Sequence, residues 1–441
     1  MGTATPTRGS GSRSAGRRAD GRDPGAAPAP RVPASTVLRA QPRTSGVGPV
    51  QLQQLVLIEL ALAALVVAAA VDELMLVPAG VLAAVLVLFA LLRRHQRSVR
   101  DWLATVLALR ARRRAATAPP AERVGPGLAP AAECAPGLRT YAFLDRERRT
   151  VGMVGDGSFL TAVIRVEAGD TALRPAFGAR AFPLALLHDA LEVDGIRLES
   201  VQLVQHVQPA PAPHLPEQAV ARRSYAPLQE QTGSPALRLT WVALKLDPEL
   251  CREAVQARGG GLEGAQRCVL RTADQLASRI TGAGFRATVL SEEELVSAVA
   301  TSACVNPMAT ARAGQPGTSP ARRTAETART WRCDDRWHTT YGVGRWPELG
   351  RAATPLPRLV SLLTAVPALT TTFSVTVARG TRRSTASVSG FVRVTGRTDT
   401  ELTGARRHLE RVARGAKVGL VRLDREQLPG ALATLPLGGT R

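Results

Sequence analysis

The sequence predicts a mixed α/β (α+β) cytoplasmic domain with two similar βαβα halves, preceded by an N-terminal transmembrane hairpin of two helices. Three observations lead to this prediction. An apolar run of about forty residues is interrupted only by two adjacent acids, short strand-like segments alternate with helix-like ones after residue 138, and one block recurs 133 residues further along the chain. Such alternation is typical of an α/β or α+β domain and not of a sandwich or a bundle.

The chain is strongly basic, with a formal net charge of +21 over 441 residues. Nearly all of the positive charge is arginine, since the only lysines are Lys245 and Lys417. More than half of the excess charge flanks the apolar run, where attraction to a membrane competes with nucleic-acid binding as its explanation. We therefore expect the lipid bilayer, and no nucleic acid, among the partners.

Residues 1–48 are rich in Gly, Ser, Pro, Ala, Thr and Arg and show no hydrophobic periodicity. This composition predicts a disordered basic tail whose arginines could contact anionic lipid. The five cysteines of the whole chain are odd in number and form no C-x-x-C pair, which argues against a disulfide framework and fits a reducing compartment. They are Cys134, Cys251, Cys268, Cys304 and Cys333.

The apolar run, within residues 49–93, predicts the transmembrane helical hairpin. Residues 52–71 and 74–92 are each long enough, as helices, to cross a hydrocarbon core of about 30 Å. Asp72 and Glu73 are costly inside lipid but not at its surface, so we expect them at the turn. Arginine-rich flanks on both sides predict two spans in the inner (plasma) membrane, with both termini and the main domain cytoplasmic.

One acid, Glu59, lies inside the first predicted span. It could pair with a neighbouring helix, or its side chain could reach back to the cytoplasmic interface. The sequence leaves both alternatives open.

Residues 94–137 are expected to form a membrane-proximal amphipathic helix followed by a linker. The stretch 98–114 places its apolar side chains on one broad side, with arginines toward its end. This pattern resembles an interfacial amphipathic helix that continues from the second span, and the alternative is a membrane-proximal helix packed on the soluble domain. Residues 115–137 are rich in Pro, Ala and Gly, which indicates a linker.

The cytoplasmic α/β domain is expected to occupy residues 138–441. Strands are predicted at 138–144, 150–154, 158–167, 196–207, 236–246, 285–290, 330–345, 371–379, 387–395 and 418–423. Helices are predicted at 183–193, 261–282, 291–303, 356–365, 398–415 and 424–434.

Two segments of this domain resemble each other. "AGFRATVLSEEELVSAVAT" begins at Ala283 and "AKVGLVRLDREQLPGALAT" begins at Ala416. Each contains a short strand, a residue suited to cap a helix (Ser291 or Asp424) and an amphipathic helix. We interpret them as the ends of two similar βαβα halves, although alanine-rich sequences also match each other by composition alone.

The sequence contains no Walker A, H-E-x-x-H or G-x-S-x-G motif. The "GDGS" at 155–158 is predicted to be a turn between strands, and "RGGGL" at 258–262 a flexible loop that is weak as a phosphate-binding loop. We assign no catalytic, cofactor-binding or metal-ligating residue.

The segment "WRCDDRWHTTYGVGRWPE", 331–348, is the densest unusual stretch. Cys333, His338 and an aspartate could form a metal site, and the Asp pair could serve a sugar-nucleotide transferase, but the spacing does not match a zinc site. We favour a β-hairpin with Asp334 and Asp335 at its tip. On that interpretation an Asp334→Asn substitution should be nearly silent.

A basic tail, a two-span hairpin and a cytoplasmic α/β domain together resemble EccE, a membrane component of the actinobacterial type VII (ESX) secretion system. "VGMVGDGSFLTAVIRVE" after the linker and W-x5-W-H-T-T-Y-x4-W-P, from Trp331 to Pro347, carry the local similarity. The resemblance implies a subunit that assembles with EccB, EccC and EccD type partners, of which the EccC type is the ATPase. It implies no cofactor and no catalytic residues.

Two functions remain after this comparison. The first is a non-catalytic structural subunit that stabilises the secretion membrane complex. The second is a membrane-anchored enzyme of transferase type that acts on a nucleotide-linked substrate at the cytoplasmic face. The absence of a recognisable acid/base pair or phosphate loop in the sequence favours the first.

Overall fold

The computed structural model describes residues 52–71, 77–81, 83–84, 93–94, 97–117, 124–169, 181–209, 216, 218–220, 223–225, 227, 237–316, 321–347, 355–380 and 386–439. The predicted tail, residues 1–48, lies outside this part of the chain. So do the predicted turn residues Asp72 and Glu73 and most of the second predicted span.

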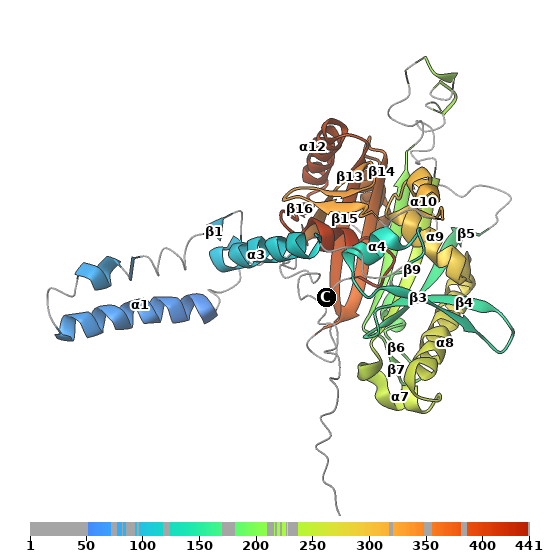
Figure 1. Ribbon diagram of the computed structural model, residues 1–441, viewed down its shortest axis with the longest axis horizontal. Helices are drawn as coiled ribbons and strands as arrows, with labels where there is room; N and C mark the ends of the chain where they lie inside the picture. Colours follow the sequence, from blue (N-terminus) through green and yellow to red (C-terminus); the bar gives the residue numbers. More distant parts are fainter. Residues whose placement is uncertain are drawn as a thin grey trace, which may run out of the picture. The chain divides into compact units, whose positions relative to one another are not determined.

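When the short strands within residues 192–197 and the short helices within residues 248–256 are set aside, the same order of elements, β-β-β-α-β-β-α-β-α, occurs twice along the chain (Figure 1). The first half comprises β3 (Arg139–Leu144), β4 (Thr150–Gly155), β5 (Leu160–Ala168), α5 (Ala185–Asp189), β8 (Ser200–Gln208), β9 (Leu237–Leu246), α8 (Gly261–Gly282), β10 (Phe285–Val289) and α9 (Glu292–Ser302). The second comprises β11 (Thr324–Glu326), β12 (Trp331–Cys333), β13 (Arg336–Arg345), α11 (Leu356–Thr364), β14 (Thr370–Arg379), β15 (Ala386–Gly396), α12 (Asp399–Gly415), β16 (Gly419–Arg422) and α13 (Gln427–Leu432). The order agrees with the predicted two halves, and each half is longer than the βαβα unit expected.

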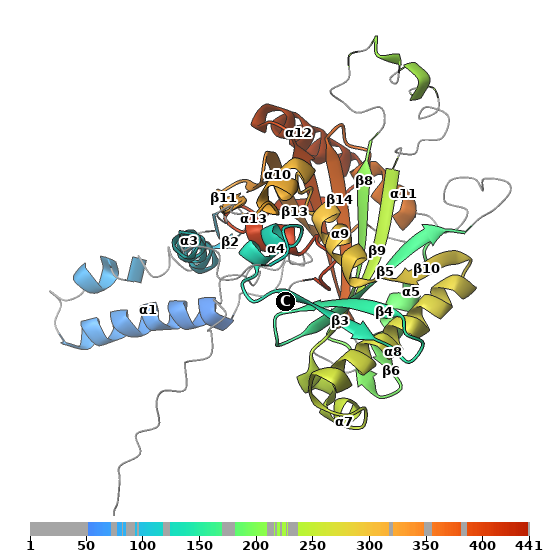
Figure 2. The same ribbon diagram turned by 45° about the vertical axis from the view of Figure 1, so that its right-hand side comes forward.

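All these strands belong to one 12-stranded sheet (Figures 1 and 2). Its order is β11-β12-β13-β15-β14-β8-β9-β5-β4-β3, and β10 and β16 add to β5 and β13. In the first half, the long strand β5 therefore pairs along one of its edges with both β4 and β10. In the second half, β13 pairs in the same way with β12 and β16. Every pairing is antiparallel, so the mixed α/β prediction is confirmed with an antiparallel sheet as its dominant feature.

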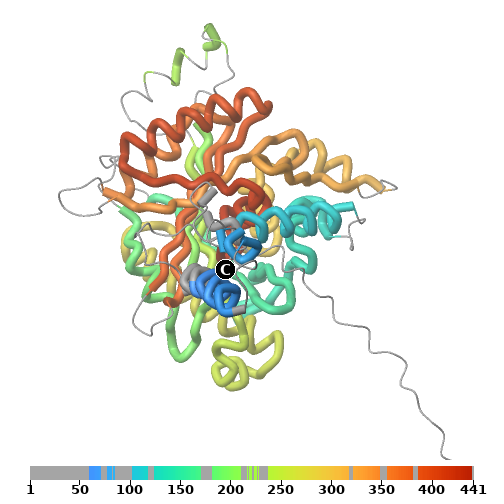
Figure 3. The backbone as a smooth tube through the Cα atoms, turned by 90° about the vertical axis from the view of Figure 1, so that its left-hand side faces the viewer, coloured from blue at the N-terminus to red at the C-terminus, as the bar shows by residue number. Residues whose placement is uncertain are grey.

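The two halves meet where β8 pairs with β14. The pairing extends from Thr371 opposite Val207 to Ala378 opposite Ser200. β8 and β14 occupy equivalent places in the two halves. The two halves are therefore joined into one sheet by the pairing of equivalent strands. Figure 3 shows the first half in green to yellow and the second in orange to red.

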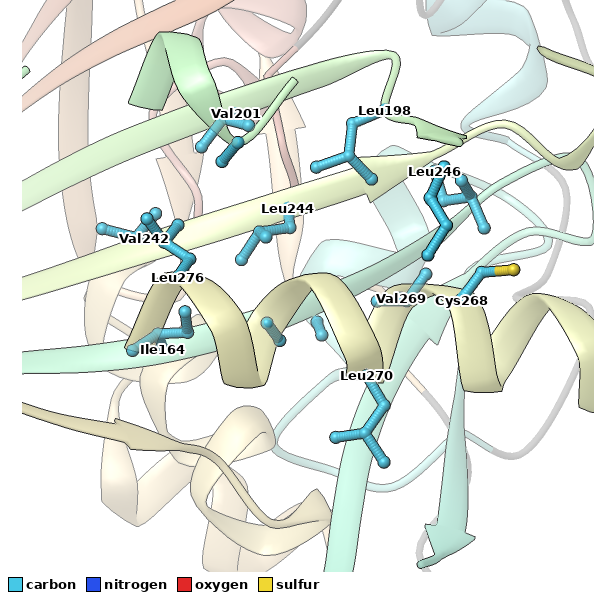
Figure 4. Packing of buried hydrophobic residues seen from close by; sticks show 14 of the residues in the cluster. Ile164, Leu198, Val201, Val242, Leu244, Leu246, Cys268, Val269, Leu270 and Leu276 are labelled. Carbon is cyan, nitrogen blue, oxygen red and sulfur yellow. The ribbon is translucent and has the colours of Figure 1, made fainter. Parts of the chain in front are cut away.

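One face of the sheet is covered by the longer helices. Side chains of α8 and of the strands β5, β8 and β9 form an apolar cluster that includes Ile164, Val201, Val242, Leu244, Val269 and Leu276 (Figure 4). In the second half, α11 and α12 cover Phe373 and Val375 of β14. Val377, on the same side of β14, joins the first cluster. Because side chains alternate along a strand, α8, α11 and α12 lie on one face.

The opposite face carries α4 (Ala129–Cys134), α9, α13 and the chain that follows α13. Polar side chains of the sheet hold residues 433–438 by their backbone. These contacts are Gln202 and Ser374 to the carbonyl of Ala433 (2.8 Å each), Thr161 to that of Leu437 (3.1 Å) and Ser200 to that of Gly438 (2.6 Å). Since Ser374 and Gln202 belong to different halves, this segment links them a second time.

The predicted helix cap at Ser291 is confirmed. Its hydroxyl accepts a hydrogen bond from the backbone N–H of Glu294, whose side chain accepts one from the N–H of Ser291. The corresponding prediction for Asp424 is wrong. Helix α13 begins later, at Gln427, and Asp424 pairs with Arg422 at 2.5 Å.

The short elements were the hardest to predict. Helix α4 lies in the stretch expected to be a linker, and α10 (Pro307–Ala313) and β11 lie in the expected loop 305–328. The predicted strand 196–207 is divided into β7 (Ile196–Arg197), which pairs with β6 (Glu192–Val193), and β8. Helix 183–193 is shortened to α5 by the same hairpin.

Near the N-terminus, α1 (Leu52–Val71) has the bounds predicted for the first span, and residues 77–81 and 83–84 are helical and lie beside it in Figures 1 and 2. No helix in the described part of the chain is both long enough and apolar enough to cross a bilayer. The two spans therefore stay a prediction. The side chain of Glu59 is exposed.

Candidate functional site: the junction of helix α3 with the sheet

Helix α3 (Val99–Ala115) is joined to the sheet by a buried ion pair. The guanidinium of Arg112 donates from Nε and Nη2 to the two carboxylate oxygens of Glu326, at 2.7 and 3.1 Å. Both side chains are almost fully buried, with exposed fractions of 6% and 4%. A two-point contact of this kind fixes both the position and the rotation of the helix end.

The carboxylate of Glu326 also binds a third element. It accepts a hydrogen bond of 2.9 Å from the backbone N–H of Leu428, in the first turn of α13. Arg112 in turn donates to the carbonyl of Arg425 at 2.7 Å. One carboxylate at the end of β11 thus ties α3, an edge strand and α13 together.

The rest of the buried side of α3 continues this contact. Thr105 and Leu109 are buried, and the guanidinium of Arg425 lies over the Trp102 ring at 5.3 Å. Leu103 and Leu107, on another side of the helix, are exposed. Of the two alternatives for this helix, the structure favours packing on the sheet domain along one side.

Asp334 is the centre of a second buried contact and does not face solvent. It forms a two-point ion pair with Arg323, with both N–O distances at 2.8 Å, and accepts a hydrogen bond from the backbone N–H of Asn306. Both ion-pair side chains are less than a tenth exposed. The hairpin prediction is confirmed, with Asp334 and Asp335 between β12 and β13. The expectation that Asp334→Asn is nearly silent rested on an exposed tip, and the buried ion pair of Asp334 argues against it.

Helix α4 enters the same network through Glu133. Its carboxylate accepts hydrogen bonds from the backbone N–H groups of Arg323 and Thr324 and from the Thr324 hydroxyl, at 2.7–3.0 Å. Burial raises the pKa of the neighbouring Cys134 thiol to about 12. This thiol is therefore protonated at neutral pH and acts as a small apolar group.

The structure does not assemble the metal alternative. The carboxylate of Asp334 is engaged by Arg323, and Nδ1 of His338 lies 3.0 Å from the Thr395 hydroxyl. Among the described residues, no group of three or more His, Cys, Asp and Glu side chains could hold a metal ion.

Two weak sequence motifs meet at one open pocket of about 540 Å³. Gly157 of the "GDGS" turn and Gly261 of the "RGGGL" loop both line it, with Tyr141, Phe159 and Arg252. The hydroxyl of Ser158 donates to Asp156 at 2.7 Å within the turn, which supports the turn interpretation over a nucleophile elbow.

Sequence reasoning missed the junction because it assigned Arg112 to the arginine-rich flank of the membrane segment. A usable signal was present. Arg112 follows Thr105 and Leu109 by seven and three residues, which places it on their side of the helix. Glu326 gave no such signal, since it lies in a stretch that looked like a loop.

A family model for EccE, described as "Putative type VII ESX secretion system translocon, EccE", matches residues 234–343. The segment begins just before β9 and ends in β13, so it includes Glu326, Arg323 and Asp334. No curated protein matches the chain. The match confirms the resemblance to EccE over this segment, which is less than half of the chain.

We predict that Arg112→Met lowers the free energy of unfolding by about 3 kcal/mol, because it leaves a buried carboxylate without its cation. Hydrogen exchange of the α3 amides should accelerate at the same time. Arg110→Met, at an exposed position of the same helix, is the matched control. Equal behaviour of the two variants would show that the ion pair does not hold α3.

Asp334→Asn should also destabilise the protein by about 3 kcal/mol, since it removes the charge that Arg323 needs. Asp335→Asn should change stability by less than about 1 kcal/mol, because Asp335 is about half exposed and lies 3.5 Å from Arg336. Urea unfolding of both variants measures the difference. A silent Asp334→Asn would show that the pair with Arg323 does not contribute to stability.

Proposed function

We propose that this chain is a non-catalytic structural subunit of the type VII (ESX) secretion membrane complex. In this proposal it stabilises the complex at the plasma membrane through EccB, EccC and EccD type partners. A hairpin of helices 52–71 and 74–92 anchors it, and both termini and the main domain are cytoplasmic. The EccE match is the observation that carries the proposal, because the matched family is a translocon component and not a known enzyme family.

The surface of α1 supports the anchor. Ala61 and Ala68 of this helix are buried, with exposed fractions of 2% and 8%, whereas four of its larger aliphatic side chains are more than half exposed. These are Leu60, Leu62, Val66 and Val67. A helix in water would bury the larger side chains first, so this arrangement suits apolar surroundings with small residues at the helix–helix contact.

The junction at Arg112 supports the structural role. An anchor contributes to assembly only if it is firmly attached to the domain that it positions. The buried pair with Glu326 provides such an attachment at the beginning of the domain. Two linked contacts, one in the membrane and one in the cytoplasm, then reinforce each other through their effective concentration.

The transferase alternative has one observation in its favour, the pocket of about 540 Å³ beside the glycine-rich start of α8. Its size suits a small ligand. Its rim side chains Glu249 and Arg252, however, pair with each other and are mostly exposed. Chemistry in such a pocket would lack a desolvated acid or base.

The topology can be tested by cysteine labelling in intact cells. A membrane-impermeant maleimide should label a cysteine at Asp72 and should not label one at Ser98, since only the turn is expected outside. The unsubstituted chain controls for reaction at its five native cysteines. Labelling of a cysteine at Ser98 would show that the predicted topology is inverted.

The role can be tested by removing the protein from its host. We expect the remaining subunits to co-purify poorly after mild detergent extraction and export to fall with them, because binding free energy is lost from the assembly. The pocket variants Arg252→Ala and Gln256→Ala should leave both assembly and export unchanged. If they abolish export while the complex stays intact, the enzyme alternative holds.

A further inference from the structure

Buried polar side chains cross the face of the sheet opposite α8 in two neighbouring rows. His338 of β13 lies opposite Thr395 of β15, and Arg393 of β15 lies opposite Thr372 of β14, which in turn lies opposite His206 of β8. All five side chains are at most 1% exposed. The row of Arg393 passes from the second half of the domain into the first at His206, whereas the row of His338 stays in the second half.

Arg393 carries a positive charge into these rows without a carboxylate partner among the described residues. Its Nη2 donates to the carbonyl of Ser302 and lies 3.4 Å from the Thr372 hydroxyl, and its Cζ lies 5.9 Å from the centre of the Trp331 ring. Its Nε and Nη1 are buried and contact no acceptor among those residues. An isolated buried charge is one of the most costly groups a fold can contain.

The two imidazoles beside Arg393 add further donors. Thr372 accepts from Arg393, so its hydroxyl can donate to Nδ1 of His206, 3.0 Å away. Thr395 accepts from Cys304, so its hydroxyl can donate to Nδ1 of His338. This assignment leaves Nε2–H of each ring as a donor, and neither Nε2 has a partner among the described residues.

Both imidazoles are neutral at physiological pH. Burial lowers the pKa of His206 to about 3 and that of His338 well below its usual value, and the charge of Arg393 lowers both further. Neither ring is therefore a cation, and Arg393 alone among these five side chains carries a positive charge. The rows thus offer one positive charge and open N–H donors, while their open acceptors are confined to threonine hydroxyls.

We propose that Arg393 binds a small monovalent anion of the chloride class on this face of the sheet, beside the C-terminal end of α9, where the carbonyl of Ser302 accepts from Nη2. A site made of a cation and N–H donors requires a ligand that only accepts hydrogen bonds, and an anion also offsets the buried charge. A phosphate group would bring a second charge and need several more donors than the rows supply. The anion would join strands of the second half near the point where they pair with the first.

Binding to the folded state alone raises its stability with anion concentration. In the purified full chain, replacing gluconate by chloride or bromide at constant ionic strength should raise Tm by about 3 °C for each tenfold increase above the dissociation constant. Arg393→Met should abolish this dependence. Arg379→Met, which changes an exposed arginine paired with Glu192, should retain it.

A second measurement does not depend on the variant folding. Crystals of the unsubstituted protein grown in bromide should show an anomalous peak beside Nε or Nη1 of Arg393. A water molecule at that place, together with a Tm that does not respond to chloride or bromide, would overturn the proposal. The outcome is independent of whether the chain acts in secretion.

Discussion

The pairing of β8 with β14 is the contact on which the rest of the fold depends. Each half contains the same succession of strands and helices, but only this ladder makes one sheet from two. Both strands are central, so their faces must be covered on both sides. The ladders satisfy the hydrogen bonds of the strand backbone within the sheet. Further stabilisation of the fold comes from the side chains and segments that cover the two faces.

The two faces of the sheet are covered in different ways. Under α8, α11 and α12 the strands present aliphatic and aromatic side chains, and the covering helices satisfy their own backbone. On the other face, residues 433–438 lie across the centre in a mostly irregular conformation, so their carbonyl groups need donors from outside. Ser200, Gln202 and Ser374 supply these donors, which explains why central strands contain buried polar residues.

The sequence predicted the elements whose information is local. Helix α8 was predicted to the residue, because a glycine run precedes it and its apolar residues follow a helical period over 22 positions. The hairpin of β12 and β13 was recognised by its acidic tip.

Elements held by distant partners were missed. Strand β11 has only three residues, and Glu133, far away in sequence, fixes its start. The pair of Arg112 with Glu326 joins residues 214 positions apart, so no periodicity could indicate it. The environment of Asp334 was hidden for the same reason, since its partners Arg323 and Asn306 lie in what looked like a loop.

The attachment of α3 has a mechanical consequence. A helix held at one point can swivel, but α3 is held by a two-point ion pair at Arg112, by a carbonyl contact to Arg425 and by the packing of Trp102 ten residues earlier. Contacts spread over three turns resist rotation about the helix axis as well as tilting. Under the proposed topology, a torque that reaches α3 would therefore be passed on to the edge of the sheet.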